Sequence, residues 1–389
     1  MAPHALSDKR RAATSPCAAP KHIVGLDLVR FAAAFGVMLF HYFSWSWLVP
    51  TSTGARVLHG AAAFSDAVVG RTWFGWVGVE VFFVISGFVI AFSAEGVSAA
   101  SFARARVLRL APAAWICASL TSVVALMISF DWRPVLAADF LRSVLFSPIG
   151  PYIDGVYWTL GIEISFYVLV FILLLVSRFR YIEGLAFVIG AVSLAFLFAT
   201  RLAPVFVHDL AERLTELSLL RHGVFFAMGV TIWACVRHGF TPWRLGFFVL
   251  MMIGAWREID LTALTFLADM QLLKGVLAPQ LLFSAAVLMI VTSVFANRAF
   301  AGSWLVAPLR TLGFATYPLY LFHQLVGTEF MKLLIGAGLP SMAAAWTTIA
   351  ACVLFAILIA TAIEPPIRNA LRNALLFAEA KLGPTPSRV

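Results

Sequence analysis

Long apolar runs dominate this sequence and constrain its fold more than any other feature. Stretches of roughly 20 apolar residues, enough to cross about 30 Å of hydrocarbon as an α-helix, recur along almost all of its 389 residues. Hydrophobic residues make up 62% of the chain and charged residues 12%, and the mean hydropathy is +0.94. This composition excludes a water-soluble domain. The runs are continuous, which predicts membrane helices and not the short alternating strands of a barrel.

We therefore predict an all-α polytopic membrane protein with about ten transmembrane helices. The seventh span is short, so we expect it to be tilted, broken or extended by its neighbours. The expected spans are Ile23–Val49, Phe74–Ala94, Pro112–Phe130, Tyr157–Ser177, Glu183–Thr200, Leu217–Cys235, Leu245–Trp256, Leu272–Phe295, Pro308–Phe330 and Met342–Ile363.

One membrane domain is expected over residues 22–372, between two tails. Residues 1–21 are polar and basic and lack the apolar core of a signal peptide, which predicts a disordered cytoplasmic tail. Residues 373–389 are expected to form a cytoplasmic C-terminal tail. The cysteines have no paired spacing, so the sequence predicts neither a disulfide framework nor a metal site; they are Cys17, Cys117, Cys235 and Cys352.

Basic residues indicate the orientation of the chain in the bilayer. With both termini in the cytoplasm, about 17 of the 28 lysines and arginines fall in segments predicted to be cytoplasmic, as the positive-inside rule requires. An even number of spans agrees with this orientation. The net charge of +9 is thus interpreted as a topology signal and a contact with anionic lipid headgroups, not as nucleic-acid binding.

The first span carries charged and titratable groups that a membrane helix does not need. A charge within a membrane helix is costly and therefore indicates function. Arg30 and His41 are 11 positions apart, about three helical turns, and lie on nearly the same face. Asp27 precedes Arg30 by three positions and could pair with it. The alternative is a buried ion pair and one satisfied histidine that only fix helix packing.

Further polar groups occur at both edges of the predicted bundle. Arg106 and Arg109 lie on one helix face at the predicted cytoplasmic edge, where two guanidinium forks suit phosphate oxygens; ordinary positive-inside anchoring is the alternative. Glu80 and Glu163 are predicted about 10 Å below the outer surface. His323 is also expected in the outer half, with His41. The small pair Ser86-Gly87, which follows Glu80, suits close helix contact.

Six patterns, in this order along the chain, resemble the membrane-bound acyltransferase-3 family, which O-acylates bacterial polysaccharides, lipopolysaccharide, peptidoglycan and some small molecules. The resemblance covers about residues 22–372. Glu80 stands where an aspartate is commoner, and Pro365-Pro366 replaces a basic residue before proline. The segments that carry the resemblance are Leu26-Asp27…Arg30 with His41, Gly78…Phe82–Phe88, Arg106-Val-Leu-Arg109 with Pro112, Trp158-Thr-Leu…Glu163…Phe166-Tyr167, Tyr320…His323 and Glu364-Pro365.

The resemblance implies that the protein is an enzyme of the bacterial inner membrane, and it also implies which substrates the enzyme uses. Acyl-CoA, either acetyl-CoA or succinyl-CoA, would be the donor substrate, and no cofactor would be permanently bound. The acceptor would be a hydroxyl of a cell-surface carbohydrate: an exopolysaccharide, lipopolysaccharide or a lipid-linked precursor.

The resemblance and the layout of charges together suggest roles for single residues. Arg106 and Arg109, with Arg30, would hold the nucleotide phosphates. His41 would be the general base, oriented by either Glu163 or Asp27. Donors to the developing oxyanion would come from a set of four residues, and a second set of four would contact the substrate. The first set is Arg30, Trp158, Tyr167 and His323; the second is His323, Glu80, Trp158 and Tyr167.

No Ser-His-Asp or cysteine nucleophile pattern is present, which favours direct transfer over an acyl-enzyme.

Two other functional classes compete with this hypothesis. A transporter or flippase of a lipid-linked saccharide is possible for a ten-helix protein, although paired halves with repeated broken helices are not evident. A scaffold that has lost activity is the third class; the presence of Arg30, His41 and Glu163 argues against it.

Overall fold

The computed structural model describes residues 23–128, 133–199, 209–295, 297 and 303–382. Within these ranges the regular structure is helical throughout, without a β-strand. Helices satisfy every backbone polar group within one segment, which is the requirement for a chain that crosses hydrocarbon. The predicted all-α polytopic fold is confirmed. The predicted tail of residues 1–21 lies outside the described residues.

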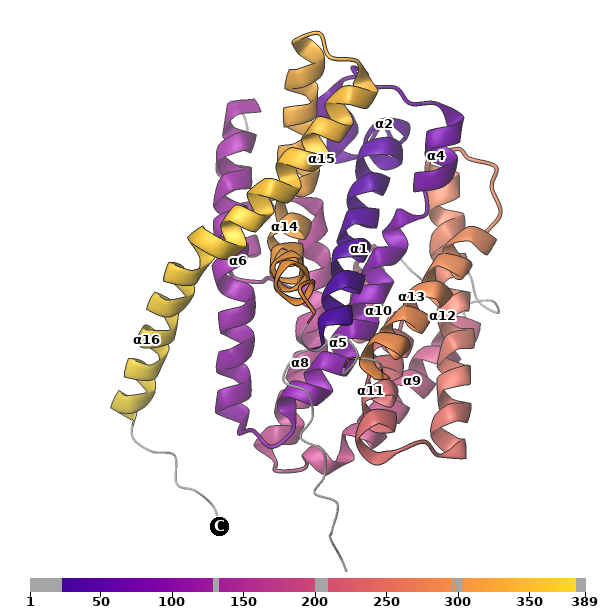
Figure 1. The fold of residues 1–389 in the computed structure, drawn as a ribbon, viewed down its shortest axis with the longest axis vertical. Helices are drawn as coiled ribbons and strands as arrows, with labels where there is room; N and C mark the ends of the chain where they lie inside the picture. Colours follow the sequence, from indigo (N-terminus) through magenta and orange to yellow (C-terminus); the bar gives the residue numbers. More distant parts are fainter. Residues whose placement is uncertain (1–22, 129–132, 200–208, 296, 298–302, 383–389) are drawn as a thin grey trace, which may run out of the picture.

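Most of the helices run roughly along the long axis of the molecule (Figure 1). The α-helices are α1 (Val24–Phe40), α2 (Ser46–Leu48), α3 (Thr53–Leu58), α4 (Asp66–Thr72), α5 (Gly78–Ala94), α6 (Ala99–Ile128), α7 (Arg133–Val144), α8 (Trp158–Leu175), α9 (Ile182–Ala199), α10 (Asp209–Leu217), α11 (Gly223–His238), α12 (Pro242–Asp269), α13 (Leu277–Phe295), α14 (Val306–Gly336), α15 (Ser341–Leu358) and α16 (Glu364–Leu382). Short 3₁₀ and π segments join some of them: η1 (His41–Trp45), η2 (Gly75–Val77), η4 (Gly155–Tyr157), η5 (Phe179–Tyr181) and η7 (Ile359–Ile363).

Seven helical runs in the described part of the chain are long and apolar enough to cross a membrane. The predicted count of ten is therefore not confirmed. The other three predicted spans correspond to α11, α12 and α14. Helix α11 has only 16 residues, while α12 and α14 are long, with 28 and 31 residues, but carry more polar side chains.

Two predicted spans differ from the helices in length, for the same physical reason. The third was expected to begin at Pro112, but α6 begins at Ala99 and continues through that proline. The seventh was expected to end at Trp256, but α12 continues to Asp269. In both cases charged residues interrupt the apolar run without ending the helix, because their side chains face polar surroundings inside the protein.

Helix α5 lies against α11 at the centre of the bundle, at a very short distance between backbones. A Cβ atom on Gly87 would lie 2.2 Å from the carbonyl oxygen of Phe226, and one on Gly229 would lie 2.0 Å from that of Val84. Only glycine allows this approach. The predicted role of Gly87 in close helix contact is confirmed.

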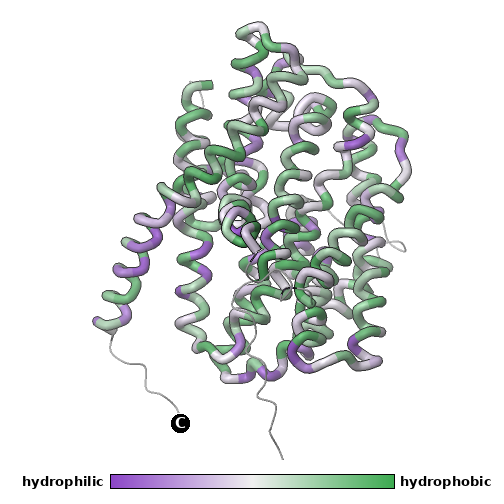
Figure 2. Tube along the Cα trace, viewed as in Figure 1, coloured by the Kyte–Doolittle hydropathy of each residue, from purple (hydrophilic) through white to green (hydrophobic). Residues whose placement is uncertain are grey.

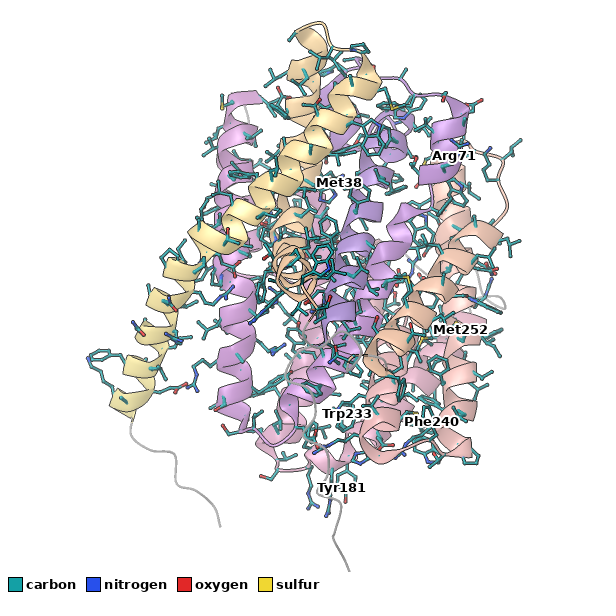
Figure 3. The ribbon with its side chains drawn as sticks, in the orientation of Figure 1. Met38, Arg71, Tyr181, Trp233, Phe240 and Met252 are labelled. Atoms are coloured by element: carbon teal, nitrogen blue, oxygen red, sulfur yellow. The ribbon has the colours of Figure 1, made fainter. Side chains whose placement is uncertain are left out.

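The connections between helices give the bundle one distinctly basic end. In Figure 3, Tyr181, between α8 and α9, and Phe240, between α11 and α12, lie toward the same end of the molecule, and Arg71 lies toward the other. Figure 2 shows mostly hydrophobic helices with hydrophilic residues near this end and along the projecting part of α16. We call it the basic end, because these connections and the adjoining helix ends carry Arg178, Arg180, Arg237 and Arg244.

Candidate active site

A cavity of about 110 Å³ lies between α1, α5, α6, α8 and α14, and we call it the arginine cavity. Arg30, Arg106 and Arg109 line it, together with Glu163 and Tyr167. The two cavity-lining arginines of α6 lie 7 and 10 positions after Ala99, where the helix begins, about 10 and 15 Å along the helix. Their place at the cytoplasmic edge of the membrane stays a prediction.

Aromatic rings hold the guanidinium groups of this cavity. The Arg106 guanidinium lies 5.5 Å from the ring centre of Phe102 and 5.8 Å from that of Tyr167, and Arg109 lies 5.3 Å from Tyr317. Such cation–π contacts position a charge without neutralising it. The Nε atom of Arg106 is buried and has no hydrogen-bond partner among the described residues. The guanidiniums are thus oriented but keep donors for an anionic ligand.

Glu163 is the carboxylate of the arginine cavity. It accepts a hydrogen bond of 2.5 Å from the Ser86 hydroxyl and another from the Tyr167 phenol. Three arginines and one glutamate line the cavity, which leaves it with an excess of positive charge. Excess cations in an enclosed, low-dielectric site attract phosphate or carboxylate groups strongly.

A second cavity, of about 360 Å³, lies farther along α5 from the basic end, and we call it the histidine cavity. His41, Glu80 and His222 line it, with Trp158 and Gln324. Glu80 and Glu163 are predicted from the sequence at the same depth, in one layer of polar side chains. The structure divides that layer, because Glu80 lines this cavity and Glu163 lines the other.

His41 and His323 form a pair whose tautomers follow from their partners. His323 is fully buried, and its Nδ1 lies 3.0 Å and 2.9 Å from the carbonyl oxygens of Leu319 and Tyr320. Carbonyl oxygens only accept, so this nitrogen carries the proton. His323 Nε2 is then an acceptor, and His41 Nδ1, 2.9 Å away, donates to it. This assignment leaves His41 Nε2 with a free lone pair, as a base requires.

The local backbone helps to present this pair. His41 begins the π segment η1, a rare conformation that is frequent at functional sites. The next residue, Tyr42, donates a 2.6 Å hydrogen bond to the carbonyl oxygen of His323. A side chain on Gly327 would collide with the Tyr42 phenol, because its Cβ would lie 1.8 Å from the hydroxyl. The Tyr42 phenol therefore fixes the contact of η1 with α14 next to the two imidazoles.

The predicted orientation of His41 by a carboxylate is corrected by these contacts. Asp27 is 14 positions before His41, about 21 Å along the same helix run, and its carboxylate lies 3.5 Å from Arg30. Glu163 is bound to Ser86 and Tyr167 in the arginine cavity. His323, predicted to contact substrate or to donate to the oxyanion, is the residue that contacts the His41 ring instead.

The two cavities adjoin, since Val79 and Tyr320 line both of them. The Tyr320 hydroxyl is within 3.1 Å of the Thr159 hydroxyl, and Phe82 packs against the tyrosine ring with its edge. A group that extends from the arginine cavity would therefore reach the histidine cavity beside a phenol. Tyr320 belongs to a motif in the sequence, but no role was predicted for it.

Comparisons with known proteins identify the family of this chain. A family described as an acyltransferase domain matches residues 23–364. No curated protein and no solved structure matches the chain. The match covers most of the chain, so the protein belongs to the acyltransferase-3 family. It is a multi-pass membrane O-acyltransferase.

Proposed function

We propose that this protein transfers an acetyl or succinyl group from acyl-CoA to a hydroxyl of a cell-surface carbohydrate at the bacterial inner membrane. The acceptor would be an exopolysaccharide, lipopolysaccharide or their lipid-linked precursor. The observation that carries the proposal is the junction of the two cavities at Val79 and Tyr320. An arginine-lined cavity suits the phosphates of the donor, and an adjoining histidine-lined cavity suits an acceptor hydroxyl.

The donor would enter from the basic end. Arg106 and Arg109, with Arg30, would bind the phosphate oxygens of coenzyme A, because each guanidinium offers several donors in one plane. The unpartnered Nε of Arg106 supports this role. The narrow pantetheine arm would then follow α5 toward Tyr320 and bring the thioester to the junction. Glu163, held by Ser86 and Tyr167, would keep the arginines apart and oriented.

The chemical step would be direct transfer. The acceptor hydroxyl would give its proton to His41 Nε2 while its oxygen bonds to the thioester carbonyl carbon. The carbon–sulfur bond would then break, and the leaving thiolate would take the proton back from His41. His323, fixed by two backbone carbonyls, would hold the imidazole in the required tautomer, as a neighbouring group does in hydrolase triads.

The phenol of Tyr320 is the best-placed donor for the developing oxyanion, because it lies at the junction of both cavities. The Thr159 hydroxyl donates to the Val156 carbonyl oxygen and accepts from this phenol, so the phenol would turn its proton from Thr159 to the thioester oxygen. Of the predicted donors, His323 uses both ring nitrogens elsewhere, and Tyr167 donates to Glu163. Arg30 and Trp158 line one cavity each.

Mass spectrometry of cell-surface polysaccharides tests the proposal. A deletion strain complemented with wild type should carry one defined acyl mass that is absent from the deletion and from a strain with His41→Ala. Purified protein in nanodiscs, given acetyl-CoA or succinyl-CoA, should release free thiol only when acceptor is present. Unchanged acylation together with altered amounts of lipid-linked precursor would contradict the proposal and indicate transport.

A further inference from the structure

Three buried side chains from separate elements meet beside the histidine cavity. Glu80 lies on α5, His222 directly precedes α11, and Glu258 lies on α12. Their exposed fractions are 3%, 2% and 0%. One ligand atom from each residue lies within 4.8 Å of the other two. Segments far apart in the sequence thus bring one imidazole and two carboxylates to a single buried point.

The polar atoms of this cluster lack the partners that buried groups normally have. Both ring nitrogens of His222 and the Oε2 atoms of Glu80 and Glu258 have no hydrogen-bond partner among the described residues. His222 Nδ1 lies 3.5 Å from Glu80 Oε2, without forming a hydrogen bond. Buried polar groups are almost always satisfied. Three unsatisfied side chains that converge therefore indicate a ligand that bonds to all of them.

Hydrogen bonds from its neighbours hold the Glu258 carboxylate in place, as is usual for a carboxylate that binds a metal. Its Oε1 accepts hydrogen bonds of 3.0 Å from Arg221 Nε and 2.6 Å from the Thr262 hydroxyl. This fixes the carboxylate and leaves Oε2 directed to the cluster. Ligating carboxylates are typically held in this way by outer hydrogen bonds.

The charges of the cluster also favour a cation. Glu80 and Glu258 bring two negative charges, and Arg221 brings one positive charge that it shares with Glu212, 3.0 Å away. When both carboxylates are ionised, a negative charge therefore remains uncompensated at this buried cluster. Burial of such a charge is unfavourable unless a cation or a proton neutralises it.

We propose that Glu80, His222 and Glu258 bind a divalent transition-metal ion of the Zn²⁺ type. A tetrahedral site with metal–ligand bonds of 2.0–2.1 Å separates its ligand atoms by about 3.4 Å, close to the 3.5 Å between His222 Nδ1 and Glu80 Oε2. The imidazole disfavours Mg²⁺ and Ca²⁺, which prefer oxygen ligands only. Three protein ligands leave one position open.

The open position faces the histidine cavity, which Glu80 and His222 line. If the proposed function holds, the ion would contact the acceptor carbohydrate there, and this part of the inference rests on that function. The metal site itself is inferred from the three side chains alone. Its test therefore measures bound metal and not acyl transfer, so that failure of either proposal leaves the other intact.

The experiment uses the full-length protein purified in detergent. Metal is removed with a chelator, Zn²⁺ is added, excess is removed by desalting, and the retained metal is measured by mass spectrometry. Wild type should retain about one ion per chain, and His222→Gln and Glu80→Gln should each lose at least tenfold in affinity. His238→Gln is the matched control, because it removes a half-exposed imidazole that lies 3.9 Å from Glu183 at the basic end.

Two results would overturn the metal site. Wild type could retain no more Zn²⁺ than the buffer blank, in which case the cluster is neutralised by protons. Alternatively, His222→Gln could retain as much as wild type, in which case the metal is bound elsewhere. Co²⁺ bound to wild type gives a second readout that needs no variant: ligand-field absorption of a tetrahedral site supports the proposal, and a purely octahedral spectrum contradicts it.

Discussion

The two adjoining cavities differ in the charged side chains that line them. Arginines from α1 and α6 surround the arginine cavity, where Glu163 is the one carboxylate of its lining. The histidine cavity has His41 and His222, with Glu80, Glu212 and Glu216 as its acids and Arg221 as its one cation. Such contrasts act more strongly in the protein interior than in water. In the proposed function, the anionic donor would be attracted by the arginines and repelled by the acids of the histidine cavity, which leaves that cavity to the acceptor.

Removal of the base should have the largest effect. We expect His41→Ala to lower kcat by about 10³-fold, since general-base catalysis contributes on the order of 10² to 10⁴. Acyl transfer is measured from the release of CoA thiol and the mass of the acceptor. His238→Ala, a histidine of the basic end, is the control and should retain activity. Recovery of a covalent acyl-protein from the His41→Ala variant would contradict direct transfer.

Weakened donor binding should follow from a change in the arginine cavity. Arg106→Gln should raise the KM for acyl-CoA by roughly 10- to 100-fold, because a charge-assisted hydrogen bond contributes about 1.5–3 kcal/mol. The KM for the acceptor should stay the same. Arg104→Gln is the matched control: it lies two residues earlier on α6, and its side chain is paired with Glu379 on α16. Equal effects of both variants would show that charge at the basic end, and not the cavity, matters.

The junction between the cavities can be tested without altering the charge of either cavity. Tyr320→Phe removes only the hydroxyl, and we expect kcat to fall roughly tenfold, the effect of one lost hydrogen bond in the transition state. Both KM values should change little. Tyr317→Phe is the control, since its ring lines the arginine cavity and its hydroxyl bonds only weakly, at 3.4 Å, to the Leu110 carbonyl. A larger effect at Tyr317 would move the reacting carbonyl out of the junction.

The arginine cavity could be predicted from the sequence better than the histidine cavity could. Arg106 and Arg109 share one helix face, so their spacing alone brings them together, and the expectation that Arg30 joins them is met. The pairing of His41 with His323 joins residues 282 positions apart, and nothing in the local sequence indicates that distance. A carboxylate seemed the natural partner for His41 because hydrolase triads use one. In the structure, the helix contact at Tyr42 and Gly327 places His323, and not a carboxylate, beside His41.

Glu258, in the cluster beside the histidine cavity, shows a second reason why part of this region could not be predicted from the sequence. Charged residues interrupt the apolar run of the seventh predicted span. The span is therefore predicted to end at Trp256, before Arg257, Glu258 and Asp260. In the structure α12 continues for three more turns, and Glu258 is fully buried. Hydropathy measures how apolar a segment is, but it does not tell whether a charge faces lipid or the protein interior.

The smallest expected effect concerns the acceptor and completes the comparison of the two cavities. Trp158 lines the histidine cavity, with its ring centre 6.0 Å from that of His222, and a flat indole is suited to stack on a sugar. Trp158→Leu should raise the KM for the carbohydrate acceptor about fivefold, which corresponds to roughly 1 kcal/mol of aromatic contact, while the KM for acyl-CoA stays unchanged. Trp304→Leu is the control, because that indole is 82% exposed. If Trp158→Leu raised the KM of the donor instead, the acyl-CoA would occupy the histidine cavity, and the assignment of the two cavities would have to be reversed.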